Sequence, residues 1–578
     1  MSERCVSVGV PVPGLGRLTY RVPAHLSMPV RGARVIVTLG SRRVTGCVIE
    51  AGVTAPESGT LKDIVEVLDA DAFLPESVVA LALWVAEYYA AGPGDALVNA
   101  LPPKSRKGEA SAFRRVPVAE WAGADATELR GEKQRVAAEV LRARPEGVPL
   151  SELRTAGVST ATVRSLERAG LVRVRDEIVE RDPFEAVGGA DGTRWTLDGT
   201  TPTKRDLTPE QAQAFRHLEE AVVVGLFKTI LLQGVTGSGK TELYLRALAK
   251  VVAEGGKGIV LVPEISLTPQ TIERFSGRFP GRVAVLHSRI PAGQLFDEWW
   301  RIRSGEFDVV VGSRGAIFAP QPRLRLIILD EEHEWTYKQQ DPAPRYHARE
   351  AAVKLASLTG ATVILGSATP QLESYHRAQT GEYRLLSLPQ RIGGADDSGE
   401  AVAMPQVRLV DLREELRSGN RSVFSRDLRR GIETALERRQ QVILFLNRRG
   451  AANFVQCRDC GYVVKCRRCS SSMTYHAGES SLRCHQCNNT TPVLLQCPDC
   501  WGPHIRFMGM GTERLELEVN KDFPKAVTLR WDRDVTQGAD SHEAILRQFL
   551  DREADILIGT QMIAKGLHLP GVTLVGVV

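Results

Sequence analysis

The sequence lacks any long uninterrupted hydrophobic run. Its longest apolar stretch, residues 78–91, contains Glu87 and is shorter than the about 20 apolar residues that a helix needs to cross a bilayer. Residues 1–15 lack the apolar core behind a basic start that marks a secretory signal. We therefore expect a cytoplasmic protein with no membrane partner, in which residues 78–91 form a buried helix.

A strong excess of charge of one sign is also missing. The chain has 74 Lys and Arg residues against 69 Asp and Glu residues, a formal net charge of +5. So small a charge is compatible with a nucleic-acid partner but does not by itself indicate one. We find no short-period internal repeat. The length of 578 residues exceeds what one hydrophobic core holds and suggests roughly three to five domains.

Cysteine is scarce outside a single cluster. Cys5 and Cys47 have no second cysteine in a CxxC spacing, and we expect them to be small buried apolar residues. The other eight cysteines form four CxxC pairs: Cys457, Cys460, Cys466, Cys469, Cys484, Cys487, Cys497 and Cys500. In a cytoplasmic protein such pairs favour metal ligation over disulfide bonds.

Two zinc ions fit these eight cysteines. Each CxxC pair can supply two thiolates to a tetrahedral Zn²⁺, and four thiolates leave the ion no open catalytic position. The zinc ions are therefore expected to be structural. Iron–sulfur clusters use the same ligands, but four evenly paired CxxC units favour zinc. The spacing alone does not decide which pairs share an ion.

Apolar runs alternate with helical patterns through much of the chain. The runs are residues 229–233, 258–263, 283–286, 309–312, 324–329 and 362–366, and then 442–446, 528–531, 556–559 and 573–578. Such alternation predicts parallel sheets covered by helices. We expect a multidomain α/β protein with two tandem RecA-like lobes, and with the cysteine cluster inserted into the second lobe.

A glycine-rich segment follows the first of these runs and fits the pattern GxxxxGK[ST]. The residues expected to bind the nucleotide phosphates are Gly234, Gly237, Ser238, Gly239, Lys240 and Thr241. Glycines let the loop turn its backbone N–H groups toward phosphates, and the helix that follows adds positive potential at its amino terminus. Lys240 is predicted to reach the β- and γ-phosphates of ATP, and the Thr241 hydroxyl to bind Mg²⁺.

Two carboxylates close the apolar run 324–329. At that strand end Asp330 can hold Mg²⁺, and Glu331 can orient or deprotonate the attacking water. An acidic run after a strand is usually a solvated turn, but the phosphate loop in the same chain favours hydrolysis. We predict an ATP hydrolase with Lys240, Asp330 and Glu331 as its catalytic residues.

Two smaller regions precede the first lobe. Residues 6–12, 34–39 and 44–50 are β-type runs broken by Gly and Pro, and a helical pattern follows them. Residues 128–183 have the pattern of three helices and then strands, which suits a winged helix. Such a module more often packs against protein than reads DNA, and the sequence leaves both roles open.

Several motifs resemble those of the PriA family of superfamily 2 DNA helicases. They are LTPEQ (207–211), PEISLTPQ (263–270), VGSRGAIFAP (311–320), DEEHE (330–334), YKQ (337–339), PRYHAR (344–349), GSATP (366–370), FLNRRG (445–450) and IGTQMIAKG (558–566). LTY (18–20), LK (61–62) and YY (88–89) also resemble the family's 3′-end-binding domain. The resemblance extends from about residue 5 to residue 578.

The resemblance implies a domain order. It comprises a small β-rich 3′-DNA-end-binding domain (1–105), a linker (106–127), a winged-helix domain (128–183), a linker (184–204), helicase lobe 1 (205–395) and helicase lobe 2 (396–578), with a zinc-binding insertion (455–503). In the family the cysteines nest, so the outer four and the inner four would each hold one ion.

The resemblance also implies roles for single residues. Gln211 would read the adenine of ATP, and the GSATP segment would couple hydrolysis to DNA. The aromatic–basic loop, residues 335–346, would stack on bases and hold phosphates; the alternative is a packing loop between lobes. The candidate DNA contacts are Thr19, Lys62, Arg314, Trp335, Tyr337, Lys338, Arg345 and Arg448.

The function that the resemblance implies is replication restart. The protein would recognise stalled or abandoned forks, unwind DNA 3′→5′ with ATP and initiate primosome assembly. Its partners would be forked and single-stranded DNA, single-stranded-DNA-binding protein and other primosome proteins, and it would be associated with the nucleoid. A restriction- or repair-type translocase would not explain the eight cysteines.

The sequence departs from the family in two places. It stops at Val578, before the family's QxxGRxGR-type motif, and it has Gly-Leu-His-Leu-Pro at 566–570 where relatives usually have Gly-His-Asp-Phe-Pro. Arginines of the absent motif stabilise the transferring phosphoryl group. Either the sequence is a fragment of a longer protein, or the protein has lost robust motor activity. The alternative function is a non-enzymatic fork-binding primosome scaffold with an impaired motor.

Overall fold

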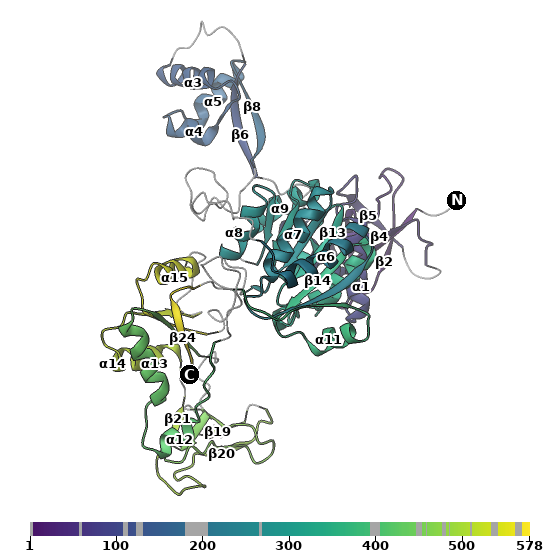
Figure 1. Ribbon diagram of the computed structural model, residues 1–578. Coiled ribbons are helices and arrows are strands. Elements are labelled where there is room, and N and C mark those ends of the chain that lie inside the picture. The colour runs from purple at the N-terminus through teal and green to yellow at the C-terminus, as the bar shows by residue number, and fades with distance from the viewer. Residues whose placement is uncertain are drawn as a thin grey trace. The chain divides into compact units, whose positions relative to one another are not determined.

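The computed structural model divides the chain into two compact units (Figure 1). One unit combines Met1–Glu264 with Phe275–Ile392, and the other combines Ile265–Arg274 with Gly393–Val578. The residues that the structure describes are 4–56, 61–107, 114–122, 131–179, 206–264, 269–288, 290–392, 405–446, 454–457, 459–476, 481–484, 486–508, 511–532, 541–560 and 569–578. The linker expected at 184–204 and the departure at 566–568 lie outside these residues.

The chain begins with a closed five-stranded barrel in the order β1-β2-β5-β3-β4. Its strands are β1 (Cys5–Gly9), β2 (Leu18–Arg21), β3 (Arg34–Leu39), β4 (Arg42–Ala51) and β5 (Lys62–Val67). The interior is filled by small branched side chains, such as Val6, Val35 and Ile64. Cys5 and Cys47 are both buried, which confirms their predicted role as small apolar residues.

Two helices connect this barrel to the first lobe. They are α1 (Glu76–Tyr88) and α2 (Pro93–Ala100), followed by the short helix η1 (Pro103–Lys107). Helix α1 confirms the buried helix predicted from residues 78–91. Its apolar side chains belong to the same continuous core as those of lobe 1, so the barrel domain and lobe 1 pack as one body.

The winged-helix region consists of β6 (Arg114–Trp121), α3 (Glu132–Ala143), β7 (Val148–Pro149), α4 (Leu150–Thr155), α5 (Thr160–Arg168) and β8 (Val172–Val179). The three predicted helices are present and enclose their own core around Leu141 and Leu166. Strand β6 pairs with β8 along its whole length, although we had placed its residues in a linker. The unit therefore begins before residue 128.

Lobe 1 is built on a seven-stranded sheet in the order β11-β12-β10-β13-β14-β9-β15, with every pair of neighbours parallel. Its strands are β9 (Lys228–Gly234), β10 (Lys257–Leu261), β11 (Val283–Leu286), β12 (Val309–Gly312), β13 (Leu324–Leu329), β14 (Thr362–Ser367) and β15 (Arg384–Leu388). All six predicted runs are strands, and β15 adds a seventh.

Helices surround this sheet (Figure 1). They are α6 (Pro209–Val224), α7 (Lys240–Ala253), α9 (Ala292–Ser304), α10 (Ala348–Thr359) and α11 (Leu372–Gln379), with the short helices η4 (Arg314–Phe318) and η5 (Trp335–Tyr337). Helix α8 (Pro269–Arg278) begins in residues of the other unit. The carboxyl ends of parallel strands meet at one sheet edge, where ligands of such folds bind. The phosphate loop follows β9 and the carboxylate pair follows β13, so both lie at that edge.

Lobe 2 has a four-stranded parallel sheet in the order β22-β23-β16-β24. Its elements are α12 (Leu412–Arg417), α13 (Arg426–Glu437), β16 (Gln441–Phe445), α14 (Thr512–Asp522), β22 (Thr528–Trp531), α15 (Ser541–Leu550), β23 (Ile556–Gly559) and β24 (Val572–Val577). Val442 and Leu444 face one core cluster and Ile443 faces another, so both faces of the sheet are covered.

The cysteine module is inserted between β16 and α14, as expected. It is a five-stranded antiparallel sheet in the order β20-β19-β18-β17-β21, formed by β17 (Phe454–Cys457), β18 (Thr474–His476), β19 (Ser481–Arg483), β20 (Thr490–Pro492) and β21 (Ile505–Met508). Across the described parts of both units, no helix has the length and apolar character that crossing a membrane requires.

Candidate nucleotide, zinc and DNA sites

The phosphate loop has the backbone shape that its glycines permit. Gly237 and Gly239 have φ angles of +81° and +80°, which L residues with side chains rarely adopt. Lys240 opens helix α7 and is buried, and its Nζ donates a hydrogen bond of 2.8 Å to the carbonyl oxygen of Gly234. The ammonium group is thus held inside the loop, where a phosphate can replace the carbonyl as its partner.

Gln211 lies against this loop. Its Nε2 donates to the carbonyl oxygen of Ser238 at 3.0 Å, and its Oε1 accepts from the backbone N–H of Thr208 at 3.0 Å. Gln211 and Thr208 form a reciprocal capping box at the start of α6. The residue expected to read adenine therefore also fixes the loop that binds phosphates, while adenine recognition itself stays a prediction.

Asp330 lies at the end of β13 and accepts a 3.1 Å hydrogen bond from the hydroxyl of Tyr244 on α7. A Cβ at Gly366 would lie 1.6 Å from that hydroxyl oxygen, so only glycine at position 366 leaves room for Tyr244. No sequence motif indicated this contact. It connects the phosphate-loop helix to the predicted Mg²⁺ ligand.

Burial, together with the neighbouring charge of Glu331, raises the pKa of Asp330 from 3.8 to about 6. A protonated carboxyl is a poor Mg²⁺ ligand. We therefore expect the affinity for Mg²⁺–ATP to fall about ten-fold per pH unit as the pH drops below about 6. Titration of a fluorescent ATP analogue with Mg²⁺ between about pH 5 and about pH 7.5 measures this.

The same titration in EDTA is the control, because without Mg²⁺ the Asp330 carboxylate has no cation to hold. An affinity for Mg²⁺–ATP that stays level across this pH range would contradict the prediction.

Without the metal, the free energy of unfolding is expected to fall as the pH rises from about 4 to about 6. The reason is that Asp330 keeps its proton to a higher pH in the folded chain than in the unfolded chain.

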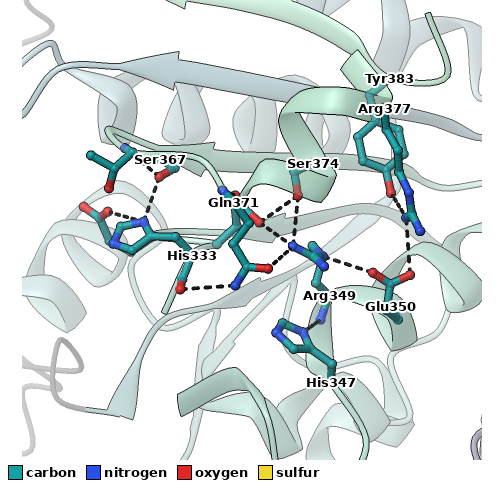
Figure 2. A network of polar contacts seen from close by, with 12 residues as sticks. His333, His347, Arg349, Glu350, Ser367, Gln371, Ser374, Arg377 and Tyr383 are labelled. Atoms are coloured by element: carbon teal, nitrogen blue, oxygen red, sulfur yellow. Dashed lines mark hydrogen bonds and ion pairs between the residues drawn. The ribbon is translucent and has the colours of Figure 1, made fainter. Parts of the chain in front are cut away.

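Glu331 has a φ angle of +48°, in the left-handed region that residues other than glycine adopt infrequently. Its carboxylate lies 3.5 Å from Nδ1 of His333. The same nitrogen lies 2.7 Å from Oγ of Ser367, at the end of β14 (Figure 2). The predicted hydrolytic residue and the GSATP segment are therefore joined through one imidazole.

Glu332 is fully buried and anchors the opposite side of this turn. Its carboxylate accepts hydrogen bonds from the N–H of Gln371 (2.8 Å), from Ser374 Oγ (2.9 Å) and from the Arg349 guanidinium (3.1 Å). Figure 2 shows Arg349 between Gln371, Ser374 and Glu350. The network joins the carboxylate turn to α10 and α11, and no sequence motif indicated it.

Replacing Glu332 with Ala removes the fully buried carboxylate that pairs with the Arg349 guanidinium and leaves only Glu350 as its ionic partner. We expect the free energy of unfolding of lobe 1 to fall by about 3 kcal/mol, because breaking a buried ion pair strands the remaining charge. Denaturant unfolding of the purified chain checks this. Glu373→Ala, an exposed change at the start of α11, is the control and is expected to have little effect. Equal stability of Glu332→Ala and wild type would refute the assignment.

The aromatic–basic loop begins directly after this turn. Trp335 is 52% exposed, but the ring of Tyr337 is buried. The single hydroxyl proton of Tyr337 lies between the carbonyl oxygens of Asp330 (2.7 Å) and Leu261 (2.9 Å). The structure gives Tyr337 a structural role in place of the DNA contact that we predicted. Tyr346 is also buried and packs edge-on against Phe318.

The other candidate DNA contacts differ in their settings. Arg345 is exposed, whereas Arg314 is half-buried and donates to the carbonyl oxygen of Thr336 within the loop at 3.1 Å. In the barrel, Lys62 is exposed and lies beside Tyr20, the neighbour of Thr19, on paired strands. Arg448 lies outside the described residues. DNA contact by these residues remains a prediction.

The eight cysteines form two groups of four: Cys457, Cys460, Cys497 and Cys500 in one, and Cys466, Cys469, Cys484 and Cys487 in the other. Within each group the sulfur atoms lie within 4.8 Å of one another. The Sγ–Sγ distances of 3.6 Å for Cys457–Cys500 and 3.5 Å for Cys466–Cys487 approach the about 3.8 Å that tetrahedral Zn–S bonds require. The residues fit two zinc ions in the nested pairing.

The CxxC turns also supply N–H groups to sulfur. The backbone N–H of Asp459, Arg468 and Asp499 each lies 3.4 Å from the first cysteine sulfur of its turn. Such donors stabilise thiolates, the form that binds zinc. Each turn ends in a left-handed residue, and only Gly461 is a glycine there; Ser470, Asn488 and Trp501 take the same conformation.

Known protein families match this chain over the barrel domain, lobe 1 and the cysteine module. Family models match in three places: "3′DNA-binding domain (3′BD)" at residues 7–102, "DEAD/DEAH box helicase" at 208–378 and "PriA DNA helicase Cys-rich region (CRR) domain" at 466–492. The Replication restart protein PriA of Bacillus subtilis is 40% identical, over 96% of this chain and 76% of that protein. The chain belongs to the PriA family.

Two other PriA proteins show the extent of the similarity. That of Haemophilus influenzae is 36% identical, over 99% of this chain and 76% of its own length. That of Synechocystis is 42% identical, over 74% of this chain and 50% of its own length. The three matched models coincide with the barrel domain, lobe 1 and the inner cysteine group. They confirm the resemblance of the sequence to the PriA family.

Proposed function

We propose that this chain is an ATP-dependent DNA helicase that unwinds DNA 3′→5′ and restarts replication at stalled or abandoned forks. One combination carries the proposal. The chain matches a 3′-DNA-binding domain, and the same compact unit contains the phosphate loop. The helix that follows this loop contacts Asp330. Glu331 is linked through His333 to Ser367. Such an arrangement suits ATP hydrolysis that responds to DNA.

The nucleotide would be held by the loop and by the first turn of α7. Lys240 would exchange its bond to Gly234 for the β- and γ-phosphates, and Thr241 and Asp330 would hold Mg²⁺. When bound, Mg²⁺ neutralises charge that develops on the phosphates. Glu331 would accept a proton from the attacking water. Ser367 would hold the imidazole of His333, and that imidazole would keep the carboxylate of Glu331 in place.

The modules suggest the DNA partners, and the resemblance to the PriA family implies the protein partners. The barrel domain would bind the 3′ end of the nascent leading strand, and the winged helix would add duplex contacts. The zinc module would hold two structural Zn²⁺ ions through its two groups of cysteines. Single-stranded-DNA-binding protein and other primosome proteins would be recruited at the fork, which would make the protein nucleoid-associated.

Strand displacement with defined polarity tests the proposal. Duplexes with a single-stranded 3′ or 5′ tail are incubated with this chain and ATP, and forks are compared with and without a leading-strand 3′ end at the junction. We expect displacement from 3′ tails, enhanced by that 3′ end and absent in Lys240→Ala. Displacement from 5′ tails alone would refute the polarity, and tight fork binding without displacement would favour the scaffold.

A further inference from the structure

Tyr89, the residue after helix α1, touches the aromatic–basic loop of lobe 1. Its hydroxyl accepts a 3.1 Å hydrogen bond from the backbone N–H of His347, and the Lys338 ammonium lies 4.7 Å from the centre of its ring. A cation over an aromatic face is attracted to it. One side chain of the amino-terminal domain thus contacts Lys338 in this loop and His347 directly after it.

The two residues that Tyr89 contacts, Lys338 and His347, form the base of the loop. Lys338 and His347 pair with each other as an antiparallel bridge, which closes the loop between them. His347 is also the N-cap of α10, because its Nδ1 accepts from the N–H of Arg349. Tyr89 therefore contacts the chain at the start of α10, the helix that carries Arg349. Arg349 in turn binds the buried carboxylate of Glu332.

The other side of the loop base leads directly to the nucleotide site. Tyr337 is next to Lys338 in the chain, and its hydroxyl donates to the carbonyl oxygen of Asp330 at 2.7 Å. The base of the loop is therefore adjacent in the chain to the side chain that supports the backbone of Asp330. Two contacts and one peptide bond therefore connect Tyr89 to the backbone of the predicted Mg²⁺ ligand.

The rest of α1 makes this connection stiff. Trp84 stacks on Tyr88 with ring centres 4.8 Å apart, and the ammonium of Lys354 on α10 lies 6.0 Å from the Trp84 ring. Helices α1 and α10 pack side by side in one continuous core. Tyr89 projects from this buttressed helix, so its contacts with the base of the loop are held in a defined place.

We infer that Tyr89 is a positioning residue that holds the base of the aromatic–basic loop and through it lets the amino-terminal domain set the response of ATP hydrolysis to DNA. The inference rests on the proposed function. Coupling between sites of this kind typically amounts to about five-fold or more in the coupled activity.

Two substitutions and one control test the inference in the full chain. Tyr89→Phe keeps the ring beside Lys338 but removes the acceptor for the His347 N–H, and Tyr89→Ala removes both contacts. Tyr88→Phe is the matched control, because Tyr88 is 60% exposed and its ring stacks on Trp84 rather than on Lys338. All variants retain Lys240, Asp330 and Glu331.

Two readouts are measured. Hydrogen–deuterium exchange of the peptide that covers residues 338–347 needs neither DNA nor ATP, and we expect faster exchange in Tyr89→Phe and faster still in Tyr89→Ala. Steady-state ATP hydrolysis with forked DNA is expected to fall about five-fold in kcat in Tyr89→Ala, with the KM for ATP and the DNA-free rate near wild type. Tyr88→Phe is expected to match wild type in both.

The outcomes separate the inference from the proposed function. Unchanged hydrogen–deuterium exchange in Tyr89→Ala would show that Tyr89 does not hold the loop. Faster exchange together with a wild-type stimulation of ATP hydrolysis by DNA would show that Tyr89 only contributes to packing. Either result overturns the inference. A wild-type chain without DNA-stimulated hydrolysis would overturn the proposed function and the coupling together, while the exchange data would still decide whether Tyr89 positions the loop.

Discussion

Replacing Glu331 with Gln is expected to lower the rate of ATP hydrolysis about 10²- to 10⁴-fold, the usual contribution of a general base. The amide keeps the size of the side chain and its place beside His333 but cannot take a proton from water. Binding of Mg²⁺–ATP is expected to stay near wild type, because Lys240 and Asp330 are unchanged. Single-turnover hydrolysis and nucleotide binding measured on the same preparation separate the two effects.

Glu219→Gln provides a matched control for this variant. It makes the same chemical change on α6, where Glu219 pairs at 3.2 Å with Lys250 in the last turn of α7, at the opposite end of that helix from Lys240. It is expected to hydrolyse ATP at the wild-type rate. If Glu331→Gln retained more than about a tenth of wild-type turnover, another group would be the base.

Removal of zinc is expected to unfold the cysteine module while leaving lobe 1 folded. The module has a short five-stranded sheet and a small core in which cysteines themselves take part, so metal binding must supply most of its stability. Structural zinc sites of this kind bind with about 10–16 kcal/mol. Metal analysis should give two Zn²⁺ per chain, one for each group of four cysteines.

Single substitutions test the pairing. Cys466→Ala is expected to lose the inner ion and retain the outer one, and Cys457→Ala the reverse. Cys47→Ala, in the barrel, should keep both ions and controls for the loss of a thiol. Iron in place of zinc, or the loss of both ions from either variant with the module still folded, would contradict the two-site assignment.

The sequence predicted the parts of the fold whose signal is local. Buried parallel strands are short apolar runs, so residues 324–329 and 362–366 could be assigned as strands without any knowledge of their neighbours. The phosphate loop and the CxxC pairs are local patterns too. The nested pairing of the cysteines came from the family resemblance, since spacing alone left it open, and the structure agrees with it.

The parts that were missed depend on contacts between distant segments. Strand β6 follows a polar stretch and was assigned to a linker with it, and its pairing with β8 is what identifies it as a strand. The partners of Glu332 lie 17 to 42 residues away on two helices, with no periodic pattern to indicate them. Tyr337 was predicted to contact DNA because aromatic residues in a basic loop often do, but its hydroxyl is needed by two buried carbonyl groups.

The most direct test of the account is ATP hydrolysis by this chain with and without forked DNA that exposes a leading-strand 3′ end, with Lys240→Ala as the blank. The account predicts hydrolysis that the fork stimulates and that Lys240→Ala abolishes. Tight binding of the fork with no hydrolysis above the blank would contradict it and would support the non-enzymatic scaffold.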